Sequence, residues 1–417
     1  MKVLHVVHGY WPATGGSQWL IKNLSERMTR DYGDEVTVFT TVAYSNALFW
    51  RRDQPSMPAG VETIEGVKVR RFAVFNRWGK LRFYLSGAAR RLRLPGFDWL
   101  LAIYNGPLIR GMSQAIARSE ADIVCATAFP LLHMQYAVRG ARQGGLPVVL
   151  VPAIHVLDPW GYDRPMIYRT ARQADRVIVY TPYEREHLAR RGVERDRLRV
   201  VGVGVDAERY SSADGRALRD RMGWGDRPVI ITLARHEPHK RIDMVIEAMR
   251  HVWRKFPESQ LVIAGERTIH SLKLDRQIDS LPDEQRARVT KIDRFTQGEK
   301  AQMLAASDVL VLASRYESFG IVFVEAWACG KPVVGIRTGP ISGVIDDGQD
   351  GLLAAYDDPG GMVDALCAVL VDAERRAAMG AAGRRKVLAN YTWEIVTRRF
   401  REVYQEAVEA HRAVRAT

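Results

Sequence analysis

The sequence has few cysteines and no long apolar run. Three of its 417 residues are cysteine and none belongs to a C-x-x-C pair, so neither a disulfide framework nor a paired-cysteine zinc site is expected. The longest apolar stretches, 99–109 and 146–154, are well short of the roughly 18 residues that a membrane-spanning helix needs. The N-terminus has one lysine before a short β-branched run, which predicts a first strand rather than a signal peptide. We therefore expect a cytoplasmic protein with no membrane-spanning helix.

Acidic residues are missing from one stretch in particular. Residues 66–97 contain nine lysines and arginines and no acidic residue, and residues 1–205 carry 29 basic against 17 acidic side chains, compared with 32 against 31 in 206–417. Leu81, Leu85, Ala88 and Leu92 recur there at helical spacing. Such a helix fits the surface of an anionic membrane, where the protein would be peripheral at the inner membrane face. An ordinary helix packed on a sheet, with solvated arginines, fits equally well. We expect no nucleic-acid partner, because no recognition motif accompanies the charge.

Short β-branched segments alternate with amphipathic segments along the whole chain, a pattern typical of parallel sheets covered by helices on both faces. A chain of this length exceeds one core, so we predict an α/β protein of two Rossmann-like, doubly wound domains. The stretch 205–228 gathers Gly, Ser, Asp and Pro, which places the boundary there. The domains are then 1–205 and 206–391, followed by a helix over 392–417 that either caps the second domain or returns to the first.

In open parallel sheets, ligands bind beyond the carboxyl ends of the strands. Gly15 and Gly16 follow the first strand and precede a helix, where free N–H groups suit a pyrophosphate; a plain tight turn is the competing interpretation. There is no G-x-G-x-x-G fingerprint. His155 follows the strand near 147–152, and a lone histidine in such a place is either structural or catalytic.

The second domain offers two further loops. Arg235 and Lys240 lie between its first strand and helix, where two cations suit two phosphates or are merely solvated. His236 and His239 flank them and are interpreted as surface histidines.

A pair of carboxylates marks the other loop, "ESFGIVFVEAWACG". Glu317 is expected in a loop and Glu325 in the first turns of a buried helix. A carboxylate in a dry site needs hydrogen-bond donors, and sugar hydroxyls are suitable ones. The Ser318-Phe319-Gly320 turn leaves N–H groups free at the start of the helix.

These residues resemble the Glu-x7-Glu signature of the retaining glycosyltransferases of family 4, which have the GT-B fold. The "PATGG" loop, His155, the Arg-x4-Lys pair and "DGQDGLLAAYDDP" extend the resemblance over most of the chain. It implies two Rossmann-like domains that face each other across a cleft. The first domain would bind the acceptor, the second a nucleotide-sugar donor, and the C-terminal helix would return to the first.

The resemblance also implies a role for each matching position. Arg235 and Lys240 would clamp the donor diphosphate, with Gly15 and Gly16 on the opposite wall. Glu317 would accept hydrogen bonds from sugar hydroxyls, and Glu325 would hold the ribose. His155 would contact the sugar or the acceptor. The loop residues that complete the donor site would be Ser318, Phe319, Gly320 and Ile321.

The expected reaction is therefore transfer of a hexose from a UDP- or GDP-sugar to a lipid-linked acceptor or a growing polysaccharide. Many transferases hold a divalent cation with Asp-x-Asp, which this sequence lacks, so we expect neither metal nor cofactor. A nucleotide-sugar epimerase of the same architecture and a non-enzymatic sugar-nucleotide sensor are the alternatives. The sequence departs from the family pattern at Ala234, 202–206, 264–270 and 338–345, which leaves the donor base and sugar open.

Overall fold

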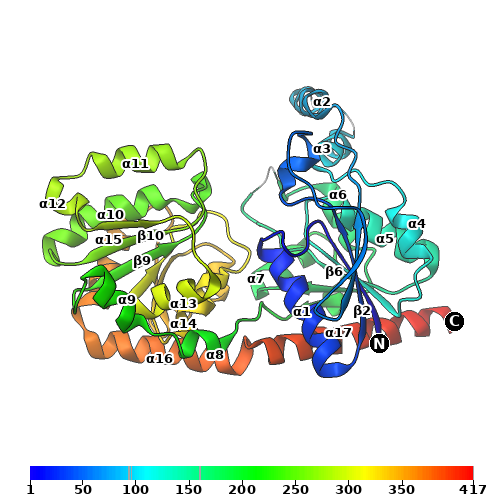
Figure 1. Ribbon diagram of the computed structural model, residues 1–417. Helices are drawn as coiled ribbons and strands as arrows, with labels where there is room; N and C mark the ends of the chain where they lie inside the picture. Colours follow the sequence, from blue (N-terminus) through cyan, green and yellow to red (C-terminus); the bar gives the residue numbers. More distant parts are fainter. Residues whose placement is uncertain (93, 95, 159–160, 417) are drawn as a thin grey trace. The chain divides into compact units, whose positions relative to one another are not determined.

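The computed structural model describes residues 1–416 apart from 93, 95, 159 and 160. Its contacts divide the chain into two compact units, one of residues 1–201 with 396–417 and one of residues 202–395. Each unit is a largely parallel sheet with helices on its faces (Figure 1). The predicted α/β class with two doubly wound sheets is confirmed.

The first unit is built on an eight-stranded sheet in the order β3-β4-β2-β1-β5-β6-β7-β8, parallel except for β3. Its strands are β1 (Lys2–Val7), β2 (Glu35–Thr41), β3 (Gly60–Ile64), β4 (Val67–Phe72), β5 (Ile123–Thr127), β6 (Val148–Val151), β7 (Arg176–Val179) and β8 (Leu198–Val200). The central strands β5 and β6 are buried along their whole length, because helices cover both faces.

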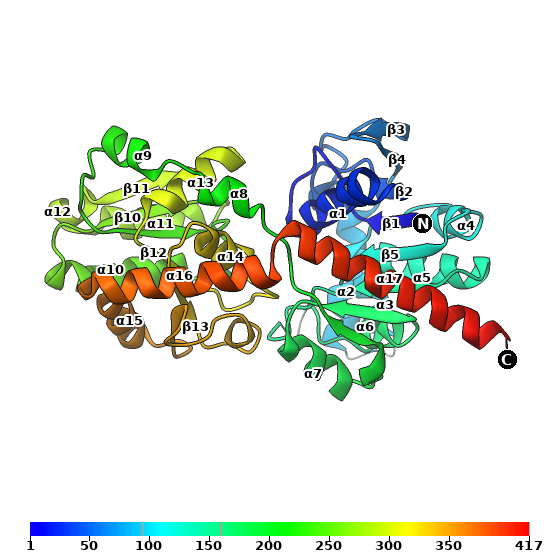
Figure 2. The same cartoon turned by 90° about the horizontal axis from the view of Figure 1, so that it is seen from below.

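The helices of this unit are α1 (Gly16–Tyr32), α2 (Gly79–Arg91), α3 (Phe97–Asn105), α4 (Met112–Ala117), α5 (His133–Gly144), α6 (Pro165–Ala171) and α7 (Pro182–Arg190), with 3-10 turns η1 (Asn46–Phe49) and η2 (Arg195–Arg197). The last helix, α17 (Trp393–Ala416), joins them from residue 396 onward. Figure 2 shows α17 running along the underside of this unit's sheet. The Tyr404 hydroxyl contacts His5 Nε2 at 2.9 Å, and Arg401 binds the buried carboxylate of Asp34. The two ends of the chain are therefore joined within one core.

The second unit has a six-stranded parallel sheet in the order β11-β10-β9-β12-β13-β14. Its strands are β9 (Val229–Leu233), β10 (Gln260–Ala264), β11 (Val289–Ile292), β12 (Val309–Val311), β13 (Val333–Ile336) and β14 (Gly351–Ala354). Its helices are α8 (Ala207–Ser211), α9 (Gly215–Met222), α10 (Ile242–Lys255), α11 (Ser271–Asp279), α12 (Asp283–Arg286), α13 (Gln297–Ala306), α14 (Ile321–Ala328), α15 (Pro359–Val371) and α16 (Ala373–Asn390), with 3-10 turns η3 (Pro238–Lys240) and η4 (Ile341–Gly343).

Both sheets contain a point where the chain reverses its direction of travel across the sheet. In the first unit this point lies between β1 and β5, and in the second between β9 and β12. At such a switch point the loops beyond the strand ends lead away to opposite sides and leave a crevice for a ligand. The glycine pair follows β1, and the loops with Arg235 and Glu317 follow β9 and β12.

In the described part of the chain, no helix is both long and apolar enough to cross a membrane.

Candidate active site

In the second unit, the two predicted loops meet at the switch point. Lys240 ends η3 after β9, and Glu317 lies in the loop between β12 and α14. Because β9 and β12 are neighbours in the sheet, the Lys240 ammonium reaches the Glu317 carboxylate and forms an ion pair with Oε1. Both side chains are mostly buried, with 18% and 12% exposed. A cation and a carboxylate are thus held in contact at the edge of the sheet where ligands bind.

Arg235 lies in the same loop as Lys240 but is far more open, since 60% of its side chain is exposed. Its Nε lies 2.9 Å from Glu266 Oε2, and its guanidinium also lies 3.5 Å from Glu237. An exposed ion pair contributes little and exchanges readily. The guanidinium can therefore leave these carboxylates for a more highly charged ligand.

The helix start after Glu317 has the form expected of an oxygen-binding loop. Gly320 is the N-cap of α14 with φ 82°, and no side chain caps this end of the helix. A Cβ at Gly320 would lie 2.5 Å from the Phe323 ring, so both the positive φ and the packing favour glycine here. Ser318 is half-buried, and Phe319 is buried just before the cap. The first-turn N–H groups, beginning at Ile321, give this end a partial positive charge.

Glu325 is buried on α14, with 4% of its surface exposed. Lys300 of α13 binds its Oε1, while Oε2 has no hydrogen-bond partner among the described residues. Tyr210 of α8 lies nearby: burial and then the charge of Glu325 raise the pKa of its hydroxyl. Lys300 thus balances the Glu325 charge, and Oε2 is a buried acceptor close to the Tyr210 hydroxyl.

The neighbouring loop after β10 approaches the Arg235 segment closely. Gly265 has φ 150°, and a Cβ there would lie 1.8 Å from the carbonyl oxygen of Ala234. The expectation of a surface position for His236 is wrong: it is 2% exposed, and its Nδ1 contacts the Ser271 hydroxyl at 3.0 Å. Burial also lowers its pKa. This histidine therefore links the loop after β9 to Ser271, the first residue of α11.

In the first unit, the glycine pair begins a helix as expected. Gly15 is the N-cap of α1, which starts at Gly16, and no side chain caps this end. A Cβ at Gly15 would lie 2.4 Å from Oε1 of Gln18. The Gln18 amide in turn lies 3.1 Å from Nε2 of the buried His8. The side chains of Gln18 and His8 therefore pack against the loop, and the uncapped N-terminus of α1 can bind an anion.

His155 lies in the loop after β6, two strands from β1 in the sheet, with β5 between them. The strand ends that carry Gly16 and His155 are thus about 10 Å apart, given the usual spacing of neighbouring strands. Its imidazole is half-buried and stacks on Tyr162 with ring centroids 4.8 Å apart. A stacked ring keeps one orientation, which a group that meets a substrate requires.

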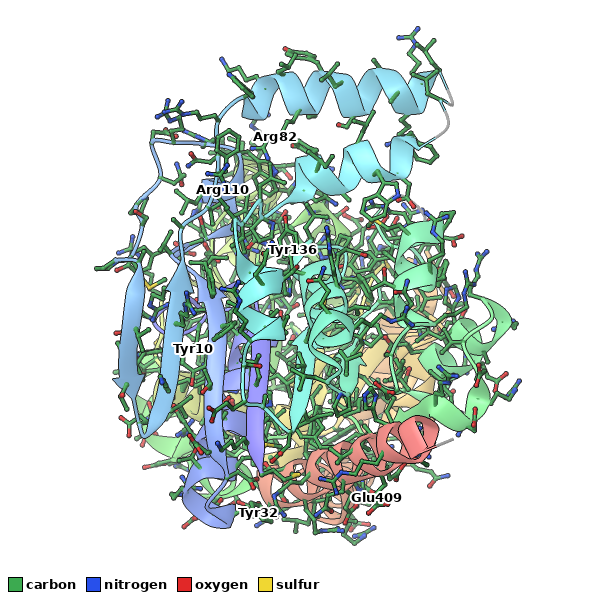
Figure 3. The ribbon with its side chains drawn as sticks, turned by 90° about the vertical axis from the view of Figure 1, so that its right-hand side faces the viewer. Tyr10, Tyr32, Arg82, Arg110, Tyr136 and Glu409 are labelled. Atoms are coloured by element: carbon green, nitrogen blue, oxygen red, sulfur yellow. The ribbon has the colours of Figure 1, made fainter. Side chains whose placement is uncertain are left out.

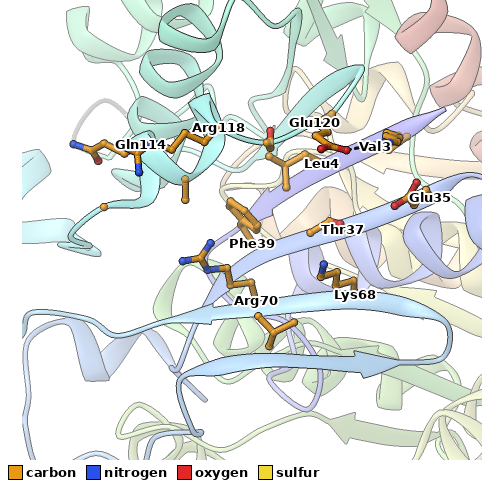
Figure 4. A pocket seen from close by; sticks show the side chains of 16 residues that line it. Val3, Leu4, Glu35, Thr37, Phe39, Lys68, Arg70, Gln114, Arg118 and Glu120 are labelled. Atoms are coloured by element: carbon orange, nitrogen blue, oxygen red, sulfur yellow. Dashed lines mark hydrogen bonds and ion pairs between the residues drawn. The ribbon is translucent and has the colours of Figure 1, made fainter.

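A groove of about 600 Å³ lies elsewhere on the first unit, between α4 and strands β1, β2 and β4. Figure 4 shows Lys68 and Arg70 facing it from β4 and Arg118 from the opposite side, with Phe39 between them. The groove begins at Lys2, the first residue of β1. It therefore extends from the amino ends of the strands, and none of the predicted site residues lies in it.

The α2–α3 hairpin exposes an unusual amount of apolar surface. Residues 75–103, which include most of this hairpin and the segment just before it, carry half of the large exposed apolar side chains that the structure describes, and we call these residues the α2–α3 patch. The patch consists of Phe75, Trp78, Leu81, Phe83, Tyr84, Leu85, Leu92, Leu94, Trp99, Leu100 and Ile103. The interpretation of α2 as a helix that packs on the sheet through its leucines is wrong, since Leu81, Leu85 and Leu92 all face outward. Arg93, one of the nine basic residues, lies outside the described residues.

A buried arginine helps to hold α2 to the unit, together with buried Ala89 and the contact of the Phe83 ring with Tyr104. Arg82 is buried and donates to the carbonyl oxygens of Phe49 and Ile103. Figure 3 shows α2 at the far end of this unit, with Arg82 on its inner side. Lys80, Arg90 and Arg91 stay exposed.

Comparison with known proteins extends over both units. Residues 15–204 match the family described as glycosyl transferase 4-like domain, and residues 216–386 match the family described as glycosyl transferases group 1. The D-inositol 3-phosphate glycosyltransferase of Saccharomonospora viridis is 32% identical over 420 residues, which cover 95% of this chain and 90% of that protein. The GDP-mannose-dependent alpha-(1-6)-phosphatidylinositol monomannoside mannosyltransferase of Mycolicibacterium smegmatis is 33% identical over 263 residues, covering 60% and 67% of the two chains.

Solved structures share the fold. Sucrose-phosphate synthase from Thermosynechococcus elongatus superposes with a TM-score of 0.75 at 20% identity, covering 98% of this chain and 100% of that one. Anabaena HepE in complex with UDP and glucose gives a TM-score of 0.72 at 18% identity, covering 96% and 98%. Both matching families, and the relative that is similar over 90% of its own length, are glycosyltransferases. The chain belongs to the family-4 type of glycosyltransferases, and it is a glycosyltransferase with the GT-B fold.

Proposed function

We propose that this enzyme transfers a hexose from a nucleoside-diphosphate sugar to an acceptor hydroxyl, with retention of anomeric configuration and without a metal ion. The observation that carries the proposal is the Lys240–Glu317 pair at the switch point of the second unit. The pair supports the proposal because a cation suited to a departing diphosphate lies against a carboxylate suited to sugar hydroxyls, and the uncapped start of α14 follows in the same loop.

In the second unit, the diphosphate is held by Arg235, Lys240 and the free N–H groups of the α14 N-terminus. Glycosyl transfer builds negative charge on the leaving phosphate, and fixed cations stabilise that charge most strongly in a site without bulk water. Because these groups supply the positive charge, the enzyme needs no divalent cation. In the first unit, Gly15 and Gly16 leave the α1 N-terminus without a side-chain cap, so it too is suited to an anion.

The nucleoside is held through Glu325. Its Oε2 is buried without a partner in the described part of the chain, and an unsatisfied buried acceptor is costly. Two ribose hydroxyls can donate to it, while the Lys300 ammonium pairs with the other carboxylate oxygen. Glu317 accepts from hydroxyls of the transferred sugar, joined by Phe319, Gly320 and Ile321 through their N–H groups.

Retention follows from attack on the face that the diphosphate leaves. The acceptor oxygen forms the new bond to the anomeric carbon as the bond to the phosphate oxygen breaks. The departing phosphate oxygen takes the acceptor's proton, so no protein nucleophile is required. His155, fixed by Tyr162, contacts the sugar or the acceptor from the first unit.

The donor is a UDP- or GDP-sugar, and the acceptor carries an inositol phosphate or a lipid. The relatives support this choice, since one acts on D-inositol 3-phosphate and another is a GDP-mannose-dependent enzyme of phosphatidylinositol mannosides. A growing polysaccharide is the other acceptor class that the family resemblance implies.

A lipid-linked acceptor would be reached at an anionic membrane surface, at the cytoplasmic face. The α2–α3 patch supports this location, because large exposed apolar patches mark interaction sites. Trp78, Tyr84 and Trp99 are side chains typical of the membrane interface, and Lys80, Arg90 and Arg91 complement anionic headgroups.

The test of donor binding is a thermal-shift screen of UDP, GDP and ADP, and of their glucose, mannose, galactose and N-acetylglucosamine conjugates, without metal. We expect one nucleotide to stabilise the protein selectively, with a smaller shift in Glu325→Ala. The chosen donor is then used with inositol phosphates and phosphatidylinositol. Turnover that EDTA abolishes and magnesium or manganese restores would refute metal independence, and an inverted anomer by NMR would refute retention.

An epimerase of the same architecture would convert the donor with no acceptor present. The family is one of transferases, which favours transfer. Donor conversion without acceptor would support the epimerase, and tight binding without turnover across the whole acceptor panel would support a sensor.

A further inference from the structure

A buried carboxylate stands behind the His155 segment. Glu184 is the third residue of α7 and is 1% exposed. One of its carboxylate oxygens accepts from the N–H of Ile154 at 3.0 Å, and the other accepts from the N–H of Tyr180 at 2.9 Å. Among the described residues, no cation forms an ion pair with it. The buried Glu184 carboxylate is therefore bound by two backbone N–H groups.

The two N–H groups belong to the ends of neighbouring strands. Tyr180 directly follows β7, and Ile154 comes three residues after β6, and these strands are paired in the sheet. Beyond their ends the sheet's own hydrogen bonds stop. The Glu184 carboxylate continues the connection by joining the two loops, one of which leads directly into His155.

The backbone just before this contact is strained. Ala153 has φ 51°, a region sparsely populated by residues with a side chain and kept only where the surroundings impose it. The next N–H along the chain is that of Ile154, which Glu184 binds. The carboxylate therefore holds the peptide that follows Ala153 and so sets the direction in which the chain presents His155.

A structural need of α7 does not account for Glu184. Thr181 already caps the helix, because its hydroxyl accepts from the Glu184 N–H at 3.1 Å. Burial without a countercharge raises the pKa of Glu184 to about 7, so an acid is costly at this place. An apolar side chain would spare that cost but would leave the two N–H groups without an acceptor.

We propose that Glu184 is a positioning residue for transfer: its carboxylate fixes the Ala153–Ile154 peptide against the end of β7 and thereby orients His155 toward the reacting sugar. This inference rests on the role proposed above for His155. Glu184 itself touches neither donor nor acceptor. Its effect should appear in the rate of transfer and not in the binding of the nucleotide, which the second unit holds.

The main variant is Glu184→Gln, which keeps one acceptor oxygen and replaces the other by an amide that cannot accept. Misplacement of a reacting group by about 1 Å can slow a reaction by about 100-fold, so we expect kcat to fall by roughly 10- to 100-fold. The dissociation constant of the nucleotide and the KM for the donor should stay within about twofold. The matched control is Thr181→Ala, which removes the cap of α7 but keeps both carboxylate contacts, and its kcat should remain near that of the wild type.

A second readout does not depend on activity. With ring-labelled histidine, the NMR signal of His155 is assigned by its loss in His155→Gln. We expect it to shift or broaden in Glu184→Gln and to stay in place in Thr181→Ala. An unchanged signal in folded Glu184→Gln would overturn the inference, whatever the activity. If Glu184→Gln does not fold, Glu184→Asp, which is too short to reach both N–H groups, replaces it.

The two readouts also separate this inference from the proposed mechanism. If His155→Gln transfers at the wild-type rate, the role proposed for His155 is wrong. Glu184 then cannot affect transfer by positioning His155. If His155→Gln is slow and Glu184→Gln is not, the mechanism stands and the positioning role of Glu184 is wrong.

Discussion

Arg235 and Lys240 differ in burial but share one expected task. Each faces charge that develops on the leaving diphosphate, so Arg235→Ala and Lys240→Ala should each lose roughly 2–4 kcal/mol of transition-state stabilisation. Initial-rate kinetics, read as kcat/KM for the donor, measures this loss. Arg250→Ala is the control, because Arg250 is a partly exposed arginine of α10 paired with Glu247. Normal turnover in either test variant would remove that residue from the site.

The buried Lys300–Glu325 pair leads to a prediction about stability. Lys300→Ala leaves a buried carboxylate without its cation, which typically costs about 3–5 kcal/mol. The midpoint of urea unfolding should therefore fall well below that of the wild type. Glu325→Gln keeps an oxygen that can accept from the Lys300 ammonium and should cost less, while it weakens nucleotide binding. Equal stability of Lys300→Ala and wild type would show that the pair is not formed in solution.

Glu184 leads to a prediction about pH. Its folded pKa of about 7 lies above the ordinary 4.5, so the folded state holds the proton more tightly than the unfolded state does. The stability that this contributes is fully present below pH 4.5 and is lost as the pH rises through 7, a change of about 3 kcal/mol. Glu184→Gln does not titrate.

Between pH 5 and pH 8, the free energy of unfolding of Glu184→Gln should therefore rise relative to the wild type by about 2–3 kcal/mol. Urea unfolding at the two pH values measures it. A difference between variant and wild type that does not change with pH would mean that Glu184 titrates at its ordinary value.

At the level of single residues, the sequence predicts those site residues that belong to a recognisable motif. Residue type and spacing suit phosphates and hydroxyls at four positions: Arg235, Lys240, Glu317 and Glu325. Lys300 was missed because one lysine in an amphipathic helix looks like a solvated charge. Burial depends on which helices pack together, and the sequence does not state that directly.

At the scale of elements, the α2–α3 hairpin makes the membrane proposal testable. A variant with Trp78, Leu81 and Leu85 changed to Ser should lose co-sedimentation with anionic phosphatidylglycerol vesicles. Each CH₂ group buried in the membrane contributes about 0.8 kcal/mol to binding. Loss of these apolar side chains should therefore weaken binding at both low and high salt. A second variant, with Lys80, Arg90 and Arg91 changed to Ser, should weaken binding mainly at low salt, because exposed charges are screened.

The control for this experiment is a pair of exposed apolar residues in the second unit, Ile269 and Leu272, both changed to Ser. That variant should sediment like the wild type. Arg82 is left unchanged, because its contacts with Phe49 and Ile103 hold α2 in place. If the wild type does not bind these vesicles at low salt, or if loss of the patch has no effect, the membrane proposal is wrong.

Helical spacing predicts that the leucines of α2 share one face, and Leu81, Leu85 and Leu92 are indeed all exposed. It could not tell whether that face turns toward the sheet or away from it. A helix buried through leucines and a helix docked through Arg82 have the same periodicity. The inner face of α2 instead carries Arg82, which donates to the carbonyl oxygens of Phe49 and Ile103, and no pattern in the sequence marks these acceptors.

At the scale of the molecule, α17 decides the stability of the first unit. Among the described residues, Arg401→Ala leaves the Met1 amine as the remaining partner of the buried Asp34 carboxylate, and we expect a cost of about 3 kcal/mol. Burial by itself would raise the pKa of Asp34, but hydrogen bonds from Arg401 and the amine outweigh it and lower the pKa.

Hydrogen exchange followed by mass spectrometry can locate this effect. Exchange should increase in β1, β2 and α17 of Arg401→Ala, while residues 202–395 and the thermal shift produced by the nucleotide stay unchanged. Increased exchange spread equally over both units would contradict the division into two separate cores.

The α/β class with two sheets could be predicted because continuous apolar strands between amphipathic helices have few other solutions. The order of the strands could not be predicted. The contact between Lys240 and Glu317 depends on β9 lying beside β12, although β10 and β11 separate them in the chain. The sequence therefore predicts which side chains suit the site, while the crossover between β11 and β12 brings them together.

The chain enters the second unit at residue 202 and leaves it at residue 395, so the first unit is interrupted by the whole of the second. On the ribosome, residues 1–201 emerge early, yet Phe400 and Tyr404, which belong to the same unit and are buried, are translated only after the whole second unit. The first unit must therefore wait for α17, while the second unit has all of its strands sooner. Synthesis from the N-terminus thus gives a protein in which the second unit can finish folding before the first.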